Sequence, residues 1–264
     1  MTKFLTKLLA YPKSRYAQIV LYKSYADLMA ETSRYYIGYL WWIIEPIIDM
    51  GVYYVIFGLV LNNKSPEFIP FLLIGTVIWR WLQTSILIGA GSIHAYRPLM
   101  DHVYVPKVIF PTVTIITNSF KFFIVFNLLI LFLLLYGYRI DITWTALPVL
   151  FAVGLLFISS VAYLFAAAVP FFPDLRIILD SVFKVLLFLS GIFAPLSKLP
   201  SGVASYLRFN PAVHILEGFR AVLMHNHWPD WQPLAMVAMA SILLTLIGIH
   251  LIYRNDTGYP KLSL

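Results

Sequence analysis

Charged side chains inside otherwise apolar segments are the residues of this chain most able to do chemistry. Glu45 and Asp49 lie four residues apart, so a helix would present both carboxylates on one face. Arg80 and Lys121 lie in two later apolar segments. Charges inside a membrane are costly and usually pair or face water. The carboxylates could relay protons or cations, pair with Arg80 or Lys121, or stay hydrated near an interface. We favour pairing and hydration, because no second set of buried acids completes a relay.

Aromatic residues make up 17% of the chain and flank these charges, with Arg80 lying between Trp79 and Trp81. Such a cluster can contact an anionic or sugar-bearing substrate, because rings pack against sugar C–H groups while Arg pairs with phosphate or carboxylate. It can equally be an interfacial aromatic belt with a snorkelling Arg. The candidate substrate-path residues are Tyr35, Tyr36, Tyr39, Trp41, Trp42, Glu45, Tyr53, Trp79, Arg80 and Trp81.

Motifs for catalysis or nucleotide binding are missing from the sequence. There is no cysteine, which excludes disulfides and Cys-based metal sites. His225 and His227 beside Asp230 are poorly spaced for a metal, and we interpret them as part of a hydrated loop. No phosphate-binding loop of the form GxxxxGK[ST] occurs. We therefore expect no enzymatic activity, no metal and no cofactor in this chain, and ATP and Mg would be used by a separate ATPase.

The composition predicts the elements that must position these residues. Hydrophobic residues make up 61% and charged residues 12% of the 264, with mean hydropathy +0.82; soluble domains are about a quarter charged. The surrounding solvent is therefore lipid. We predict an all-α membrane protein of one domain (1–264), with six transmembrane helices over Ile37–Leu61, Phe68–Ile88, Val108–Tyr136, Ala146–Val169, Ile177–Phe193 and Leu234–Tyr253.

Two further segments are helical without spanning. Ser14–Ser33 mixes apolar and charged residues, which suits an amphipathic helix at the interface or an ordinary soluble helix. Ala194–Trp231 contains four prolines and apolar runs too short to cross a membrane. Its segments Val203–Phe209 and Ala212–Met224 predict two short helices, either a re-entrant hairpin buried in protein or surface helices of an external loop.

Lys and Arg predict the orientation. Eleven lie in the N-terminal segment, the second and fourth connections and the tail, and five, including Arg220, lie on the other side. This bias predicts that both termini are cytoplasmic, with 1–34 cytoplasmic or interfacial, 35–254 in the membrane and 255–264 a cytoplasmic tail. The polar connection Gly89–Lys107 is then cytoplasmic. Its Tyr96-Arg97-Pro98 turn and the short helix predicted over Leu99–Val105 could insert into a motor protein, or form a passive loop.

Two motifs resemble those of a known family. Arg34-Tyr35-Tyr36-Ile37-Gly38-Tyr39-Leu40-Trp41-Trp42-Ile43-Ile44-Glu45-Pro46 resembles the R-x-x-x-G-Y-L-W-x-x-x-E-P motif at the start of the first span in ABC-2 permeases that export capsular polysaccharide and O-antigen. Asn210-Pro211-Ala212-Val213-His214-Ile215-Leu216-Glu217 resembles their N-P-x-x-H-x-x-E segment before the last span. Tyr96-Arg97-Pro98-Leu99 lies where the family has its cytoplasmic connection. The likeness covers nearly the whole chain in length, span order and motif position.

The resemblance implies a homodimeric permease in the bacterial inner membrane, with two copies of a separate ABC ATPase. The substrate would be a lipid-linked polysaccharide, and further partners would be membrane lipid and periplasmic or outer-membrane export components, with no nucleic acid. Residues Tyr96, Arg97, Pro98, Leu99, Asp101 and His102 would couple the ATPase to the membrane. The segment with Asn210, Pro211, His214 and Glu217 would re-enter from the periplasm. The alternatives are a polytopic transferase of envelope biogenesis and a proton-coupled carrier.

Overall fold

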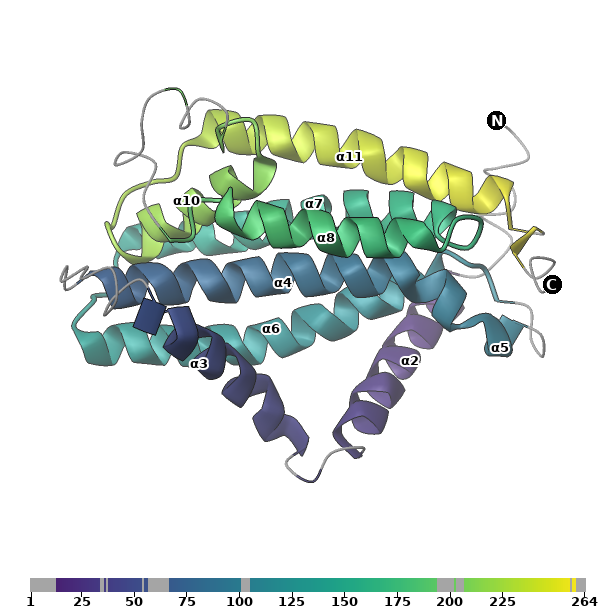
Figure 1. Cartoon of the computed structure of the whole chain (residues 1–264), viewed down its shortest axis with the longest axis horizontal. Helices are drawn as coiled ribbons and strands as arrows, with labels where there is room; N and C mark the ends of the chain where they lie inside the picture. Colours follow the sequence, from purple (N-terminus) through teal and green to yellow (C-terminus); the bar gives the residue numbers. More distant parts are fainter. Residues whose placement is uncertain are drawn as a thin grey trace.

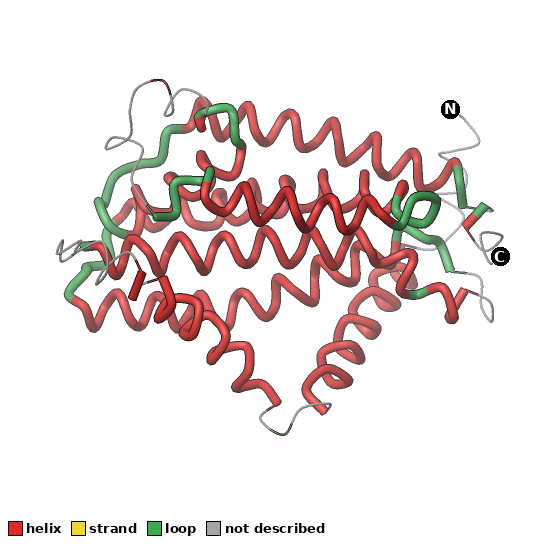
Figure 2. The backbone as a smooth tube through the Cα atoms, viewed as in Figure 1, coloured by secondary structure: helices red, strands yellow, loops and turns green. Residues whose placement is uncertain are grey.

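Helices account for all the regular secondary structure in the part of the chain that is described. The computed structural model describes residues 13–33, 36, 38–53, 55–56, 67–100, 105–193, 202, 207–256 and 258–259, and no strand occurs among them (Figure 2). The all-α prediction is confirmed. The elements are α2 (Lys13–Ser33), η1 (Gly38–Leu40), α3 (Trp41–Tyr53), α4 (Phe68–Ala95), α5 (Arg97–Met100), α6 (Ile109–Tyr136), η3 (Ile142–Ala146), α7 (Leu147–Ala168), α8 (Asp174–Phe188), α10 (Pro211–Leu223) and α11 (Trp231–Arg254).

Helix α4 lies at the centre of the bundle. It packs against α6 and α7, α8 and α10 also contact it, and α11 runs along α7 (Figure 1). The long helices run roughly side by side, whereas α2 and α3 cross them steeply and together form a V beneath α4 and α6 (Figure 1). The beginning of α2, α5 and the end of α11 all lie at the same end of the bundle. The elements predicted to be cytoplasmic are thus gathered at one end.

Among the described residues, four helical segments are long and apolar enough to cross a membrane: Phe68–Ala95, Ile109–Tyr136, Ile142–Ala168 and Trp231–Arg254. At 1.5 Å per residue, the 28 residues of α6 extend about 42 Å, beyond the roughly 30 Å hydrocarbon core. This confirms the prediction of a long third span. Large apolar side chains remain exposed along α11, which suits contact with lipid. The chain is a multi-pass membrane protein.

Small residues let the long helices approach closely. A Cβ at Gly248 of α11 would lie 2.8 Å from the Cβ of Tyr163 and 2.8 Å from the backbone nitrogen of Leu164, both in α7. A Cβ at Gly89 of α4 would lie 2.9 Å from the Cβ of Ala162. In lipid, burial of apolar surface does not drive helices to associate, and close packing at small residues stabilises the contact between them instead. Close packing between helix backbones therefore stabilises the central bundle.

Several predicted boundaries change in the structure. Helix α4 continues to Ala95, so the prediction that it ends at Ile88 is wrong; Gly89, Ala90, Gly91 and Ser92 are buried against neighbouring helices, and this packing favours helix over loop. The predicted Tyr96-Arg97-Pro98 turn is present only at Tyr96, because α5 begins at Arg97. The helix predicted over Ala212–Met224 is present as α10. Most of Val203–Phe209 lies outside the described residues.

Candidate functional site

Both carboxylates of α3 pair with one guanidinium of α4. Glu45 and Asp49 each form an ion pair with Arg80, as their spacing of four residues allows. The three side chains are partly exposed, so the cluster lies at the edge of the bundle and not in its core. The pairing predicted from the sequence is confirmed. Since both carboxylates share one cation, the cluster ties α3 to α4.

A second ion pair joins α2 to α6. Lys121 pairs with Glu31, and the indole nitrogen of Trp42 donates a hydrogen bond of 3.3 Å to the same carboxylate. The Lys121 ammonium also lies 5.5 Å from the centre of the Trp42 ring. Glu31 therefore holds together α2, the beginning of α3 and α6. The sequence analysis missed Glu31 because it placed α2 at the interface, without a partner helix.

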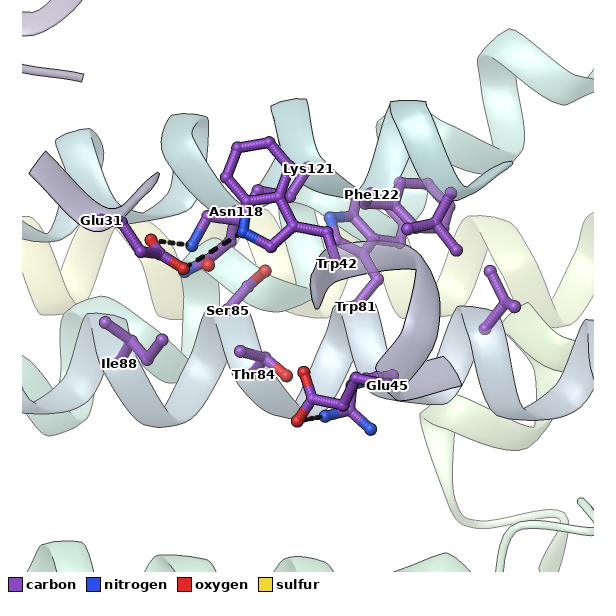
Figure 3. Close-up of a pocket in the computed structure, with 13 residues that line it drawn as sticks. Glu31, Trp42, Glu45, Trp81, Thr84, Ser85, Ile88, Asn118, Lys121 and Phe122 are labelled. Carbon is purple, nitrogen blue, oxygen red and sulfur yellow. Dashed lines mark hydrogen bonds and ion pairs between the residues drawn. The ribbon is translucent and has the colours of Figure 1, made fainter. Parts of the chain in front are cut away.

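The two ion pairs border a pocket of about 160 Å³ between α2, α3, α4 and α6 (Figure 3). Figure 3 shows Glu31 and Trp42 on one side and Glu45 on another, with Ser85 between them. Its walls are largely aromatic and aliphatic. The residues that line it are Glu31, Trp42, Glu45, Val77, Arg80, Trp81, Thr84, Ser85, Ile88, Asn118, Lys121, Phe122 and Val125.

A second cleft, of about 360 Å³, lies between α3, α4 and α8. Arg80, Thr84 and Ile88 line both cavities, so the two lie against neighbouring faces of α4. The second cleft also includes Arg176 at the beginning of α8. Its lining residues are Asp49, Thr76, Trp79, Arg80, Gln83, Thr84, Leu87, Ile88, Arg176 and Leu187.

The tryptophans on either side of Arg80 are packed inside the bundle. Trp81 stacks on Phe122 with ring centres 4.2 Å apart and donates a hydrogen bond of 3.2 Å to the Ser119 hydroxyl. Trp79 contacts Phe183 of α8 at 5.7 Å. Both indoles are buried, so the cluster is not a belt facing the interface. Each nevertheless presents an edge to one of the two cavities.

The candidate aromatic residues in and just before α3 are in part buried, in part exposed and in part outside the described residues. Trp42 is buried and lines the pocket, whereas Trp41 is 41% exposed and Tyr36 is fully exposed. Neither of these two lines either of the cavities described above. Tyr35 and the side chains of Tyr39 and Tyr53 lie outside the described residues. The structure therefore places Trp42, Glu45, Trp79, Arg80 and Trp81 around the cavities.

The predicted coupling segment is tied to α2. The Tyr96 hydroxyl donates a hydrogen bond to the Asp27 carboxylate, and Lys23 lies over the Tyr96 ring at 4.7 Å. Burial, with a further contribution from Asp27, raises the pKa of Tyr96, so the phenol stays a neutral donor. Lys23, Asp27 and Glu31 recur every four residues on one face of α2.

The coupling residues that follow Tyr96 are only partly described. Arg97 and Pro98 form the first turn of the short helix α5. The Leu99 side chain, Asp101 and His102 lie outside the described residues. The charged face of α2 therefore runs from the Tyr96 corner to the pocket.

The Asn210–Glu217 motif forms the N-terminal part of helix α10. Asn210 caps α10 by accepting a hydrogen bond of 3.0 Å from the Ala212 amide, and Pro211 occupies the first turn. His214 bonds the Arg208 carbonyl at 2.7 Å. Glu217 is exposed on α10. Asn210, Pro211 and His214 thus shape the beginning of α10.

Arg220 is a structural residue that the sequence analysis missed. We counted it only as one of the five Lys and Arg residues on the side opposite the termini, and it is 5% exposed in the structure. Its guanidinium donates hydrogen bonds to the carbonyls of Gly191 (2.8 Å), Ile192 (3.1 Å) and Phe71 (3.2 Å). The residue is buried because α10 turns its apolar side, which carries Arg220, toward α4 and the end of α8. A helical wheel of α10 could have shown this.

Metal-binding geometry is not found in the described part of the chain, where no three His, Cys, Asp or Glu side chains gather as a metal site. His225 and His227 are exposed, and Asp230 caps α11 by accepting a hydrogen bond of 3.3 Å from the Gln232 amide.

The sequence profile of the ABC-2 type transporter family matches residues 18–224, from α2 through α10. The chain belongs to the ABC-2 type transporter family. It is 28% identical over 220 residues to the O-antigen export system permease protein RfbA of Myxococcus xanthus, which covers 83% of this chain and 85% of that protein. It is 27% identical over 233 residues to the polysialic acid transport protein KpsM of Escherichia coli (87% and 90%).

A third relative of this ABC-2 transporter is the capsule polysaccharide export inner-membrane protein CtrC of Neisseria meningitidis. The two are 26% identical over 246 residues, covering 88% of this chain and 89% of that protein. The matches extend over nearly the full length of each relative. The similarity therefore includes the pocket, the coupling segment and α10 of this ABC-2 transporter.

Proposed function

We propose that this chain is the membrane-spanning subunit of an ATP-driven exporter for a lipid-linked cell-surface polysaccharide. The observation that carries the proposal is the set of relatives: three that match over more than four fifths of both chains are named for export of O-antigen, polysialic acid or capsular polysaccharide. Membership of the ABC-2 family supports a transport function for the fold itself. The sugar repeat and the lipid carrier are left open by the proposal.

The proposed topology has six spans: the four long helices, together with α3 and α8. The described part of α3 is 13 residues long and α8 is 15, and both are apolar and exposed on one side. An even number of spans agrees with the beginning of α2 and the end of α11 lying at the same end of the bundle. The bias in Lys and Arg makes that end cytoplasmic. On this topology α10 and the short segment before it re-enter from the periplasmic side.

The proposed assembly is a homodimer with two ATPase subunits bound beneath the cytoplasmic end. The short helix α5 and the charged face of α2 are the coupling surface, because Tyr96 and Asp27 connect them. No phosphate-binding loop occurs in the sequence, so hydrolysis of ATP belongs to the partner. The substrate path passes along α3 and α4, where charged and aromatic side chains border the two cavities.

Deletion of the gene tests this function directly. We expect loss of surface polysaccharide with accumulation of the polymer inside the cell, and recovery of both when the wild-type gene is supplied on a plasmid. Normal surface polymer in the deletion strain would overturn the proposal. Loss of polymer synthesis, without accumulation inside the cell, would instead indicate a transferase.

A further inference from the structure

Both cations that line the pocket between α2, α3, α4 and α6 are already paired, and Arg80 pairs with Asp49 as well as with Glu45. Four charged side chains line the pocket, and each is paired with another of them: Glu31 with Lys121, and Glu45 with Arg80. An anionic ligand such as a phosphate would find no free cation here and would have to displace a carboxylate. The geometry therefore favours an uncharged ligand that hydrogen-bonds to carboxylates and cations already in place.

The pocket also contains an unsatisfied polar group. Ser85 is fully buried, and its hydroxyl has no hydrogen-bond partner within the described part of the chain. Several helix serines in this bundle bond back to their own helix; Ser160 in α7, equally buried, bonds the Phe157 carbonyl at 2.7 Å. A buried hydroxyl without a partner costs free energy, which a polar ligand would recover and an acyl chain would not. The pocket floor therefore favours a hydroxyl-bearing ligand over a lipid tail.

The walls of the pocket also carry aromatic side chains that can contact a sugar ring. Trp42, Trp81 and Phe122 line the pocket, with Trp81 and Phe122 stacked on each other, and aromatic rings are surfaces against which the C–H groups of a sugar can pack. The volume of about 160 Å³ is below the range of about 300–1,000 Å³ typical of pockets for drug-sized ligands, which limits the occupant to about one ring. The rim carboxylates remain partly exposed, with the Glu31 side chain at 38% and that of Glu45 at 46%. A sugar ring held in the pocket could therefore remain joined to the rest of the polymer outside it.

We propose that this pocket is a sugar-binding site that holds one pyranose ring of the exported polymer, with Glu31 and Glu45 accepting hydrogen bonds from its hydroxyls and Ser85 bonding its inner edge. The proposal rests on the function proposed above and adds to it a subsite within a single subunit. Hydroxyl recognition by paired carboxylates would tolerate different neutral sugars and would not require a charged one.

Photo-crosslinking in cells that make the polymer tests the subsite. A diazirine-bearing aliphatic amino acid replaces Val125, which lines the pocket, and in a control strain it replaces Phe120, which is 52% exposed on the same helix and does not line it. After irradiation, the crosslinked species is identified by glycan-specific detection and mass spectrometry. We expect glycan on position 125 and phospholipid on position 120. Phospholipid alone, or no adduct, on position 125 would overturn the proposal.

A pair of serine variants separates recognition from structure. Ser85→Ala removes the unpartnered hydroxyl of a residue that lines the pocket, and Ser160→Ala removes an equally buried hydroxyl elsewhere. The glycan adduct at position 125 should fall by about two- to tenfold in Ser85→Ala, as expected for one lost hydrogen bond, and stay unchanged in Ser160→Ala. Equal yields in both would contradict the role of Ser85. If the deletion strain loses surface polymer while position 125 captures only lipid, the export function stands and the sugar site alone is wrong.

Discussion

Replacement of Arg220 by methionine is predicted to destabilise the whole bundle. Arg220 joins three segments that are distant in the sequence: α10 itself, the Gly191–Ile192 turn after α8 and the first turn of α4 at Phe71. Its guanidinium carbon also lies 3.5 Å from the centre of the Phe71 ring. A Cβ at Gly75 would collide with the guanidinium, so the site is shaped around this side chain. Methionine keeps the length and removes every donor.

The size of the effect follows from the three acceptors. Removing one partner of a buried charged contact costs about 3–5 kcal/mol, because the groups left behind are unsatisfied. The variant no longer buries a guanidinium, and methionine fills most of the space, so we expect the lower end, about 3 kcal/mol. At about 2–4 °C per kcal/mol for a chain of this size, the midpoint of thermal unfolding should fall by about 6–12 °C.

Thermal stability of a fluorescent fusion in detergent, followed by size-exclusion chromatography, measures this change. Arg208→Met is the matched control, because Arg208 is exposed just before α10, and it should unfold within about 2 °C of the parent. Arg220→Lys should give an intermediate loss, since an ammonium keeps the charge and cannot reach all three carbonyls. An Arg220→Met variant as stable as Arg208→Met would refute the assignment of Arg220 as the residue that holds α10 in place.

Three further predictions concern coupling and packing. Glu31→Lys and Lys121→Glu should each reduce export, and the double exchange should restore a large part of it, as measured by surface polymer at equal protein level; no recovery would mean that the pair does not act as a pair. Arg97→Ala and Asp101→Ala should leave membrane insertion and ATP hydrolysis by the assembled complex intact while export falls, and normal surface polymer in both would remove the coupling role of this segment. Gly248→Leu should lower the amount of folded protein severalfold, because a side chain there would separate α11 from α7; unchanged levels in a membrane fraction would contradict the packing.

The sequence was most informative where a pattern is local. Spacing of four residues put Glu45 and Asp49 on one helix face, and Arg80 was one of two cations available, so their pairing could be predicted. The cap at Asn210 is local as well. Helix lengths followed from the length of the apolar runs, as α6 shows. Such features depend on neighbours within one or two turns.

Features that depend on which helices meet could not be predicted in this way. Glu31 pairs with Lys121 only because α2 crosses α6, and hydropathy does not determine that crossing. Arg220 was counted only toward the orientation of the chain, yet three backbone carbonyls accept hydrogen bonds from it inside the bundle. The extension of α4 to Ala95 likewise depends on glycines that pack against α7 and α8. Tertiary contacts decided each of these cases.

Reconstitution tests the central claim that this chain is a conduit driven by a separate ATPase. The purified chain is placed in proteoliposomes, alone or with the ATPase encoded beside it, and the lipid-linked polymer is supplied on the outer side, where the ATPase sites face. The account predicts ATP-dependent accumulation of polymer in the lumen with both proteins present, and none with either protein alone or with a non-hydrolysable nucleotide. Transport by the chain alone under a pH gradient, or accumulation that does not depend on ATP, would contradict it.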